Sequence, residues 1–149
     1  MVVEASLPVH VVEIEQELRQ IAGVVRRRGR SLLEQFGITP PQFDALVILD
    51  RAGDLTIGEL SNRLYLAYST TTDLVDRLER AGFVVRSRDT ADRRVVLVKL
   101  QEKGKQVIER VLDARRAYLG VVLESLDESE RLQILKVLNV LHDRMLGTE

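Results

Sequence analysis

The chain has 149 residues, enough for one domain with a buried core; 45% of them are hydrophobic and 30% are charged. This composition excludes a disordered tail and a disulfide-stabilised miniprotein. The absence of cysteine excludes thiolate metal ligands and a cysteine nucleophile, and the two histidines, His10 and His142, lie near opposite ends of the sequence. No apolar run is long enough to span a bilayer, and the first residues do not resemble a signal peptide. We therefore expect a soluble, cytoplasmic protein that is not an enzyme and holds no metal or cofactor.

The positive charge of the sequence is concentrated in its middle. Residues 63–105 carry 10 Lys and Arg against 6 Asp and Glu, whereas the formal charge of the whole chain is −1. A basic segment in an otherwise acidic chain is typical of a module that approaches phosphate groups. Ordinary variation in surface charge produces the same asymmetry, so this pattern needs support from the fold.

The first third of the sequence predicts two helices. From residue 11 to residue 36, apolar side chains recur at spacings of three and four, which predicts a long amphipathic helix that ends at Gly37. Pro40 and Pro41 suit the first turn of a second helix because the fixed φ of proline is helical, and Gly53 ends that helix.

Two further helices follow at the spacing of a helix-turn-helix. Thr56 and Glu59 form a capping box that opens a short helix. Residues 69–72 are of the types favoured at helix N-caps, and we expect them to open the next helix, which ends at Gly82. Two helices joined by about four residues predict a helix-turn-helix. The residues of the second helix expected to face the core are Thr71, Leu74, Val75 and Leu78.

The pattern then changes to that of a β-hairpin. Residues 83–88 and 95–100 are rich in β-branched side chains and flank a charged segment, 89–93. After Gly104, and again after Leu126, apolar positions at helical spacing predict two last helices. The predicted order is four helices, a hairpin and two helices, a mainly α fold with a small β-hairpin wing.

A helix-turn-helix followed by a hairpin is a winged helix-turn-helix. Its second helix fits the major groove of B-DNA, while the hairpin reaches the neighbouring backbone. Hydroxyl groups in the first helical turn can bond to phosphate oxygens or base edges, and arginines of the hairpin add positive charge. The residues expected to contact DNA are Ser69, Thr70, Thr72, Asp73, Arg77, Arg86, Arg88, Arg93 and Arg94. We expect Asp92 to pair with an arginine and to hold the tip of the hairpin in shape.

Two carboxylates on the second helix leave another function open. Asp73 and Asp76 would lie near phosphates, which is unfavourable, although Asp73 can also accept a hydrogen bond from the amino group of cytosine. The alternative is therefore a winged-helix protein–protein adaptor that does not bind DNA. Salt dependence separates the two functions, because only binding to DNA releases condensed counterions.

Over residues 57–104, the sequence resembles the MarR (multiple antibiotic resistance regulator) family of transcription factors. Residues 69–79 look like the recognition helix of that family, and the stretch Asp92-Arg93-Arg94 with the strand after it looks like its most characteristic motif. The flanking helices have the number, order and length of the family, so the resemblance covers nearly the whole chain. It implies one domain, 1–149, with a winged helix-turn-helix at about 40–101 and dimerisation helices at about 5–36 and 104–147.

The terminal helices are long and carry more apolar surface than a small winged domain can cover. The resemblance implies a two-fold dimer whose chain ends intertwine, which places the recognition helices roughly 34 Å apart and requires a pseudo-palindromic operator. A monomeric helical extension is the alternative. The residues expected at the dimer interface are Val9, Val11, Leu126, Leu132, Leu135, Leu138, Leu141 and Met145.

The resemblance also implies control by a small molecule, in which an often aromatic anion releases a repressor from its operator. Arg26, Arg27 and Arg30 of the first helix could supply an anion site, although a solvated helix face explains them more simply. The absence of cysteine excludes sensing by thiol oxidation. The expected partners are double-stranded DNA, a second copy of the chain and a small-molecule effector, with no membrane.

Overall fold

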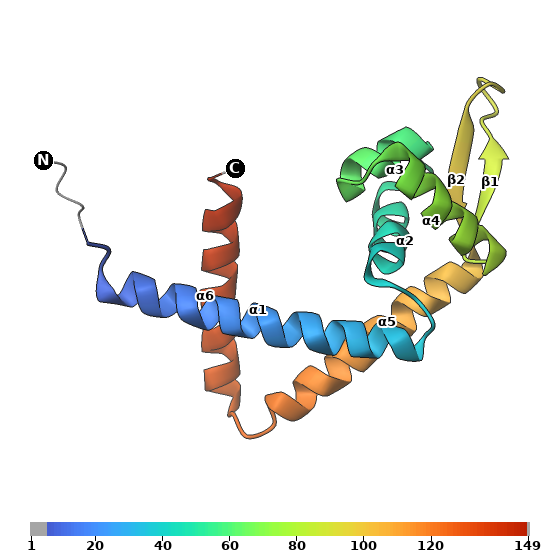
Figure 1. Cartoon of the computed structure of the whole chain (residues 1–149). Helices are drawn as coiled ribbons and strands as arrows, with labels where there is room; N and C mark the ends of the chain where they lie inside the picture. Colours follow the sequence, from blue (N-terminus) through green and yellow to red (C-terminus); the bar gives the residue numbers. More distant parts are fainter. Residues whose placement is uncertain (1–5, 149) are drawn as a thin grey trace, which may run out of the picture. The chain divides into compact units, whose positions relative to one another are not determined.

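In the computed structural model, which describes residues 6–148, the protein forms six helices and a two-stranded hairpin (Figure 1). In chain order the elements are α1 (Val9–Gln35), α2 (Pro40–Ala52), α3 (Ile57–Leu64), α4 (Tyr68–Arg80), β1 (Val84–Arg88), β2 (Val96–Leu100), α5 (Glu102–Val122) and α6 (Glu128–Leu146). The predicted order and the mainly α class are confirmed. The chain divides within α5 into two compact units, one ending at Val111 and the other beginning at Leu112. Within residues 6–148, no helix is long and apolar enough to cross a membrane.

The core of the first unit lies between α2, α3, α4 and the hairpin, which pack together in the upper right of Figure 1. Its largest fully buried side chains are those of Leu46, Leu60, Thr71, Val75, Leu78, Val84, Val98 and Val111. Leu74 is also buried, so the predicted inward face of α4 is confirmed. The hydroxyl of Thr71 donates to the carbonyl oxygen of Ala67 at 3.1 Å, which satisfies the polar atom of this buried side chain.

Local sequence signals set most of the helix boundaries. The predicted capping box of α3 is present, because the hydroxyl of Thr56 accepts from the Glu59 N–H at 3.1 Å while the Glu59 carboxylate accepts from the Thr56 N–H at 2.8 Å. Thr39 and Asp127 cap α2 and α6 in the same way. The glycines predicted to end helices all have positive φ: Gly37, Gly53 and Gly82.

The start of α4 differs from the prediction. Residues 69–72 are wrong as the N-cap, because α4 begins at Tyr68 with Ala67 as its N-cap and with no side-chain capping bond. Ala67 has the extended backbone that an N-cap needs, with φ −62° and ψ 149°. The hydroxyls of Thr71 and Thr72 donate to the carbonyl oxygens four residues before them, at 3.1 and 3.0 Å. The hydroxyl residues therefore lie inside the first turns of the helix, where their side chains can bond to backbone carbonyls of the preceding turn.

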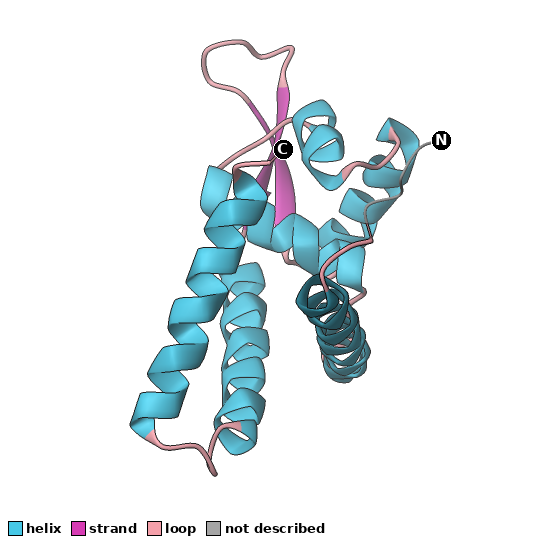
Figure 2. Ribbon diagram, turned by 90° about the vertical axis from the view of Figure 1, so that its left-hand side faces the viewer, coloured by secondary structure: helices cyan, strands magenta, loops and turns pink. Residues whose placement is uncertain are grey.

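The hairpin is fixed at its base and extends away from the core toward its tip (Figure 2). β1 and β2 pair antiparallel, with Val84 opposite Leu100. At the base, the Val98 N–H donates to the carbonyl oxygen of Leu55 at 2.7 Å, and the Leu55 N–H donates back at 3.3 Å. Because Val98 and Leu55 are both buried, these bonds hold the base of the hairpin to the helical core.

Helix α5 begins against the base of the hairpin at a point where no side chain fits. A Cβ on Gly104 would lie 2.5 Å from the carbonyl oxygen of Phe83 and 2.6 Å from Cδ1 of Leu100. The first of these atoms belongs to the backbone and cannot turn aside as a side chain can. Glycine is therefore required here by the close approach of α5 to the segment that leads into β1.

We expect Gly104→Ala to lower the free energy of unfolding by about 1–3 kcal/mol, because the added methyl forces the backbone of Phe83 or α5 to move. Gly120→Ala, in the same helix, is the matched control, since no described atom outside its own local helix lies within 4 Å of the added Cβ. That substitution should be neutral or stabilise by up to about 1 kcal/mol. Urea denaturation measures both effects. A Gly104→Ala protein as stable as the wild type would contradict the close packing of this junction.

Candidate nucleic-acid interface

The exposed side of α4 presents a short polar face. Ser69, Thr70, Asp73 and Arg77 are exposed, as predicted. Thr72 is half-buried, and its hydroxyl donates to a backbone carbonyl, so only its oxygen and methyl group remain for a ligand. Within the described part of the chain, Arg77 has no ion-pair partner. This face therefore offers two hydroxyls, one carboxylate and one available guanidinium over about two turns.

The N-terminal end of α4 also has the chemistry of an anion site. Because Ala67 caps the helix without a side-chain bond, no capping side chain occupies the N–H groups of the first turn. Free N–H groups and the positive end of the helix dipole both favour a phosphate. The hydroxyls of Ser69 and Thr70 lie in this same turn, so backbone and side-chain donors occur together.

At the tip of the hairpin, Asp92 organises Arg94. Both oxygens of the Asp92 carboxylate accept from the Arg94 guanidinium, at 3.1 Å each, and Oδ1 also accepts from the Arg94 N–H at 3.1 Å. The side-chain bond from Arg94, followed by the backbone bond, lowers the pKa of Asp92 below its ordinary value. The carboxylate therefore remains ionised to a lower pH than an unpaired aspartate does. The predicted pairing of Asp92 with an arginine is confirmed.

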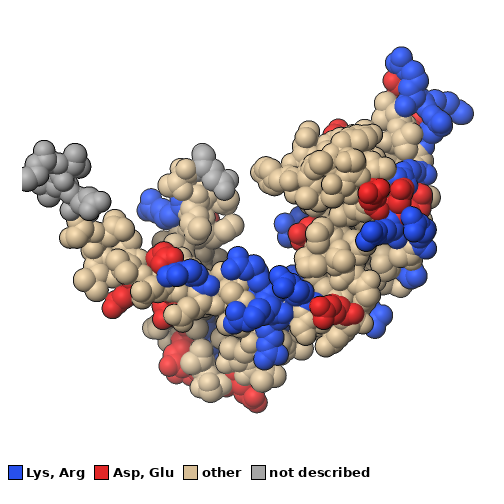
Figure 3. All heavy atoms as spheres, in the orientation of Figure 1, with Lys and Arg blue, Asp and Glu red and all other residues tan. Residues whose placement is uncertain are grey.

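Three arginines, Arg88, Arg93 and Arg94, outweigh two aspartates, Asp89 and Asp92, and leave the tip of the hairpin with a net positive charge. The Arg88 guanidinium donates to the carbonyl oxygen of Arg93 at 2.7 Å, across the base of the tip. The Arg93 side chain is exposed, and it has no hydrogen-bond partner among the described residues. Figure 3 shows Lys and Arg side chains gathered at this end of the hairpin, in the upper right of the view. The tip is therefore a basic projection whose shape is set by Asp92.

Arg86, predicted as a DNA contact, is engaged inside the protein. Its guanidinium donates to Asp76 at 2.6 Å and to Glu79 at 3.0 Å, and its backbone N–H donates to Glu79 at 2.7 Å. Desolvation lowers the pKa of Arg86, but the hydrogen bonds and charges of the two carboxylates together outweigh it and raise the pKa above its ordinary value. The charge of Arg86 is thus compensated by α4, and the three side chains tie β1 to the recognition helix.

The same contacts change the interpretation of Asp76. From the sequence, Asp76 is a carboxylate that would face phosphates. In the structure its Oδ1 accepts from Arg86, so it serves as a counter-ion within the protein. Asp73 is left as the uncompensated acid of the exposed face of α4.

Lys103 is a further residue at this site that the sequence analysis missed. Its ammonium donates to the carbonyl oxygen of Ala81 at 2.7 Å and lies 5.3 Å from the centre of the Phe83 ring. Ala81 is the C-cap of α4, where a positive charge is favourable. Lys103 therefore ties the first turn of α5 to the end of the recognition helix. A lysine twenty-two residues after its partner gives no local sequence signal.

Most of the residues predicted for a dimer interface are exposed. On α1, Val9 and Val11 are exposed, as are the α6 side chains of Leu132, Leu135, Leu138 and Met145. Leu126 and Leu141 are half-buried. No residue of α6 is buried, which is unusual for a helix this rich in leucine and valine.

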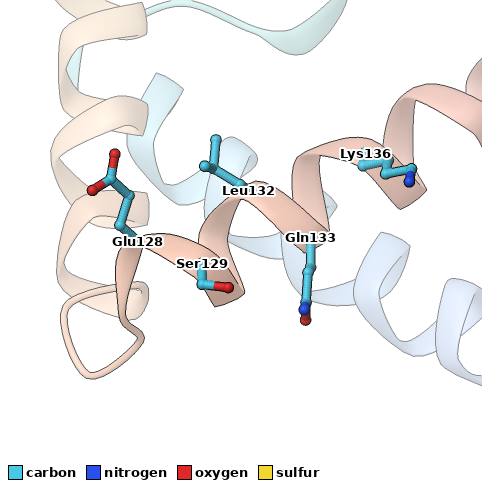
Figure 4. A pocket seen from close by; sticks show the side chains of 5 residues that line it. All are labelled: Glu128, Ser129, Leu132, Gln133 and Lys136. Atoms are coloured by element: carbon cyan, nitrogen blue, oxygen red, sulfur yellow. The ribbon is translucent and has the colours of Figure 1, made fainter.

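The arginines predicted for an effector site, Arg26, Arg27 and Arg30, are exposed on α1. A separate shallow hollow lies on α6, where one helix supplies all the lining side chains: Glu128, Ser129, Leu132, Gln133 and Lys136 (Figure 4). The hollow is wide open and has no arginine in its lining. The predicted arginines and this hollow are therefore distinct features of the surface.

Comparisons with known proteins agree with the geometry of the site. The MarR family model matches residues 38–96, from α2 to the first residue of β2. The uncharacterized HTH-type transcriptional regulator YsmB of Bacillus subtilis is 48% identical over 121 residues, which are 81% of this chain and 83% of YsmB. The HTH-type transcriptional repressor MdtR of the same organism is 31% identical, over 81% of this chain and 78% of its own.

The chain belongs to the MarR family. A solved structure of a MarR family protein from Bacillus stearothermophilus is 48% identical and superposes with a TM-score of 0.85, covering 95% of this chain and 99% of that one. As a MarR-family member, the protein is a DNA-binding transcriptional regulator and not an enzyme.

The roles of two arginines in this MarR-family protein can be separated by salt dependence. We expect Arg86→Met to lower the free energy of unfolding by about 1–2 kcal/mol, because it removes charged hydrogen bonds and leaves two carboxylates unpaired. It should weaken DNA binding and leave the slope of log affinity against log salt unchanged. Arg93→Met should leave stability unchanged and make that slope shallower by about one, the loss of one phosphate contact.

Fluorescence anisotropy on labelled duplex DNA across a salt series measures both slopes, and thermal denaturation measures stability. If Arg86→Met reduced the slope as much as Arg93→Met, Arg86 would be a phosphate contact and its assignment to the wing–helix junction would fail.

Proposed function

We propose that this MarR-family protein is a homodimeric repressor that binds a pseudo-palindromic double-stranded operator and is released by a small, aromatic anionic effector. The observation that carries the DNA-binding part is the polar exposed face of α4, which Arg86 joins to the hairpin that carries the basic tip. A recognition helix and a wing in fixed relation can occupy a major groove and the adjacent backbone at the same time.

We assign the contacts according to what each side chain has available. Ser69, Thr70 and Arg77 project from α4 and carry free polar groups, so they are placed in the major groove at base edges or phosphates. Arg93, together with the Nη1 group of Arg94 that Asp92 does not bind, contacts the flanking DNA from the tip of the hairpin. Arg88 and Thr72 have donors already bonded to backbone carbonyls, and Asp73 is the carboxylate of the exposed face of α4, so we give these three residues secondary roles.

A protein–protein adaptor is the second candidate, and it rests on the acidic residues of α4. Its support is reduced by the pairing of Asp76 with Arg86, which leaves Asp73 as the exposed acid of that face. Asp73 can accept from a cytosine amino group in the major groove. DNA binding therefore accounts for the acidic residues of α4, and no protein partner is needed to explain them.

The homodimer is supported by apolar surface that the single chain leaves in water. Eight large hydrophobic side chains of α6 are exposed, and α1 exposes a further series from Val9 to Val25. Full burial of one such side chain is worth about 1.5–3 kcal/mol, so two chains gain much by covering these helices together. A second copy is the simplest occupant, because two-fold pairing also supplies the second recognition helix for a palindromic site.

Repression and release by an effector rest on family relationship and on chemistry. The relative MdtR is named as a transcriptional repressor. Arg26, Arg27 and Arg30 place three exposed guanidinium groups within about one turn of α1, which suits a carboxylate or another small anion. Binding there would act by favouring a spacing of the two winged domains that no longer fits the operator.

DNA binding is tested by anisotropy with duplexes from upstream of the protein's own gene and a scrambled control. We expect tight, sequence-dependent binding that weakens steeply with salt. Thr70→Val should lower affinity for the operator by about tenfold through loss of a base-edge hydrogen bond, and should leave affinity for scrambled DNA unchanged. Equal losses on both duplexes would remove Thr70 from base recognition. A wild-type protein that binds no duplex at low salt would favour the adaptor.

The dimer is tested with glutamates on α6. We expect Leu135→Glu with Leu138→Glu to give monomers, because two charges cannot be buried in an apolar interface, and to weaken operator binding at least a hundredfold through loss of two-site attachment. Lys136→Glu is the matched control, since it introduces the same charge at a neighbouring exposed position that is not apolar. Sedimentation velocity measures the oligomeric state. A double variant that stays dimeric would place the interface elsewhere.

A further inference from the structure

Tyr65 adopts a backbone conformation that tyrosine rarely takes. It is the C-cap of α3, with φ 54° and ψ 38°, and it is the non-glycine residue with positive φ among the described residues. The left-handed region costs free energy for any side chain with a Cβ, and glycine is the usual residue at such a helix end.

The turn between α3 and α4 explains the left-handed backbone of Tyr65, but it does not explain why the residue there is a tyrosine. The backbone N–H of Tyr65 donates to the carbonyl of Asn62, and the N–H of Leu66 donates to the carbonyl of Ser61 at 3.1 Å. These bonds end α3 and turn the chain toward α4. Tyr65 is 96% exposed, and its hydroxyl has no hydrogen-bond partner among the described residues. Glycine would form the same turn without strain, so nothing within the chain accounts for a tyrosine.

The position of Tyr65 next to α4 indicates which kind of ligand its side chain contacts. Between residues 40 and 100, the exposed large hydrophobic side chains are those of Tyr65, Tyr68 and Val85. Tyr68 is the first residue of α4 and is 63% exposed, next to Ser69 and Thr70. The two tyrosines therefore extend the DNA-facing surface of α4 toward the turn before it. An exposed aromatic residue held in a strained turn beside a recognition helix points to an external ligand.

We propose that Tyr65 is an operator contact whose hydroxyl donates a hydrogen bond to a DNA phosphate at the edge of the major groove, with Tyr68 beside it. The proposal rests on the proposed binding of α4 to DNA. Residues 64–72 contain no charged side chain, so this contact is made by an uncharged donor. Tyrosine hydroxyls are common donors to phosphate oxygens, and such contacts fix the register of a protein on the duplex.

Salt dependence distinguishes the loss of an uncharged contact with DNA from the loss of a charged one. Loss of a Lys or Arg contact weakens binding and also flattens its salt dependence, because fewer counterions are released. Loss of the Tyr65 contact should weaken binding and leave the salt slope of the wild type unchanged. Relief of the left-handed strain should at the same time keep or raise the stability of the folded protein.

The experiment compares wild type, Tyr65→Gly and Tyr65→Phe by anisotropy on the operator across a salt series and by thermal denaturation. We expect both variants to bind about three- to tenfold more weakly, the effect of one net hydrogen bond, with an unchanged salt slope. The melting temperature of Tyr65→Gly should equal or exceed that of the wild type, while Tyr65→Phe keeps the same backbone strain. Arg93→Met serves as the control in which the slope does change.

Wild-type affinity in Tyr65→Gly would overturn the proposal. Wild-type affinity in Tyr65→Phe, with loss in Tyr65→Gly, would overturn the hydroxyl–phosphate contact. These results differ from failure of the proposed function, in which the wild-type protein itself would not bind the operator.

Discussion

Arg86 holds the wing to the recognition helix, and the DNA-facing surface depends on that connection. Its guanidinium is shared between Asp76 and Glu79, and its backbone N–H adds a third bond to Glu79. A two-stranded hairpin has little stability alone, so its direction must be set by what it packs against. Bonds from Leu55 fix its base, and Arg86 fixes its side against α4. These bonds therefore join α4 and the hairpin into one surface.

Lys103 and Gly104 extend this connection into α5. Lys103 binds the C-terminal carbonyl of α4, and Gly104 allows α5 to approach the backbone of Phe83 closely. The start of a helix that continues into the second unit is thus joined directly to the recognition helix. A change in the direction of α5 has to move α4 or break these contacts. In the proposed dimer, this junction is the physical route by which a change in dimer geometry would reach the DNA-binding surface.

The surface charge of this region follows from which charges are paired. Arg86 pairs with both Asp76 and Glu79 across the junction of α4 and β1, and Asp92 binds Arg94 at the tip. Arg77 and Arg93 remain available, and the first turn of α4 adds uncharged donors. Recognition in this protein therefore combines a few free cations with hydroxyl and N–H groups, and it does not depend on a continuous basic patch.

The order of the helices and the hairpin, the buried side of α4, the capping box at Thr56 and the pairing of Asp92 are all predictable from the sequence, because periodicity and contacts between near neighbours carry that information. The start of α4 was predicted at the wrong residue. A run of hydroxyl residues can cap a helix, but it can equally lie inside the first turns with its hydroxyls bonded to carbonyl oxygens four residues earlier. Three features emerge only from the folded chain: Arg86 is bound by Asp76 and Glu79, Gly104 must lack a side chain, and Tyr65 is strained and exposed. Those features depend on how separate elements approach one another in space, which spacing along the chain does not encode.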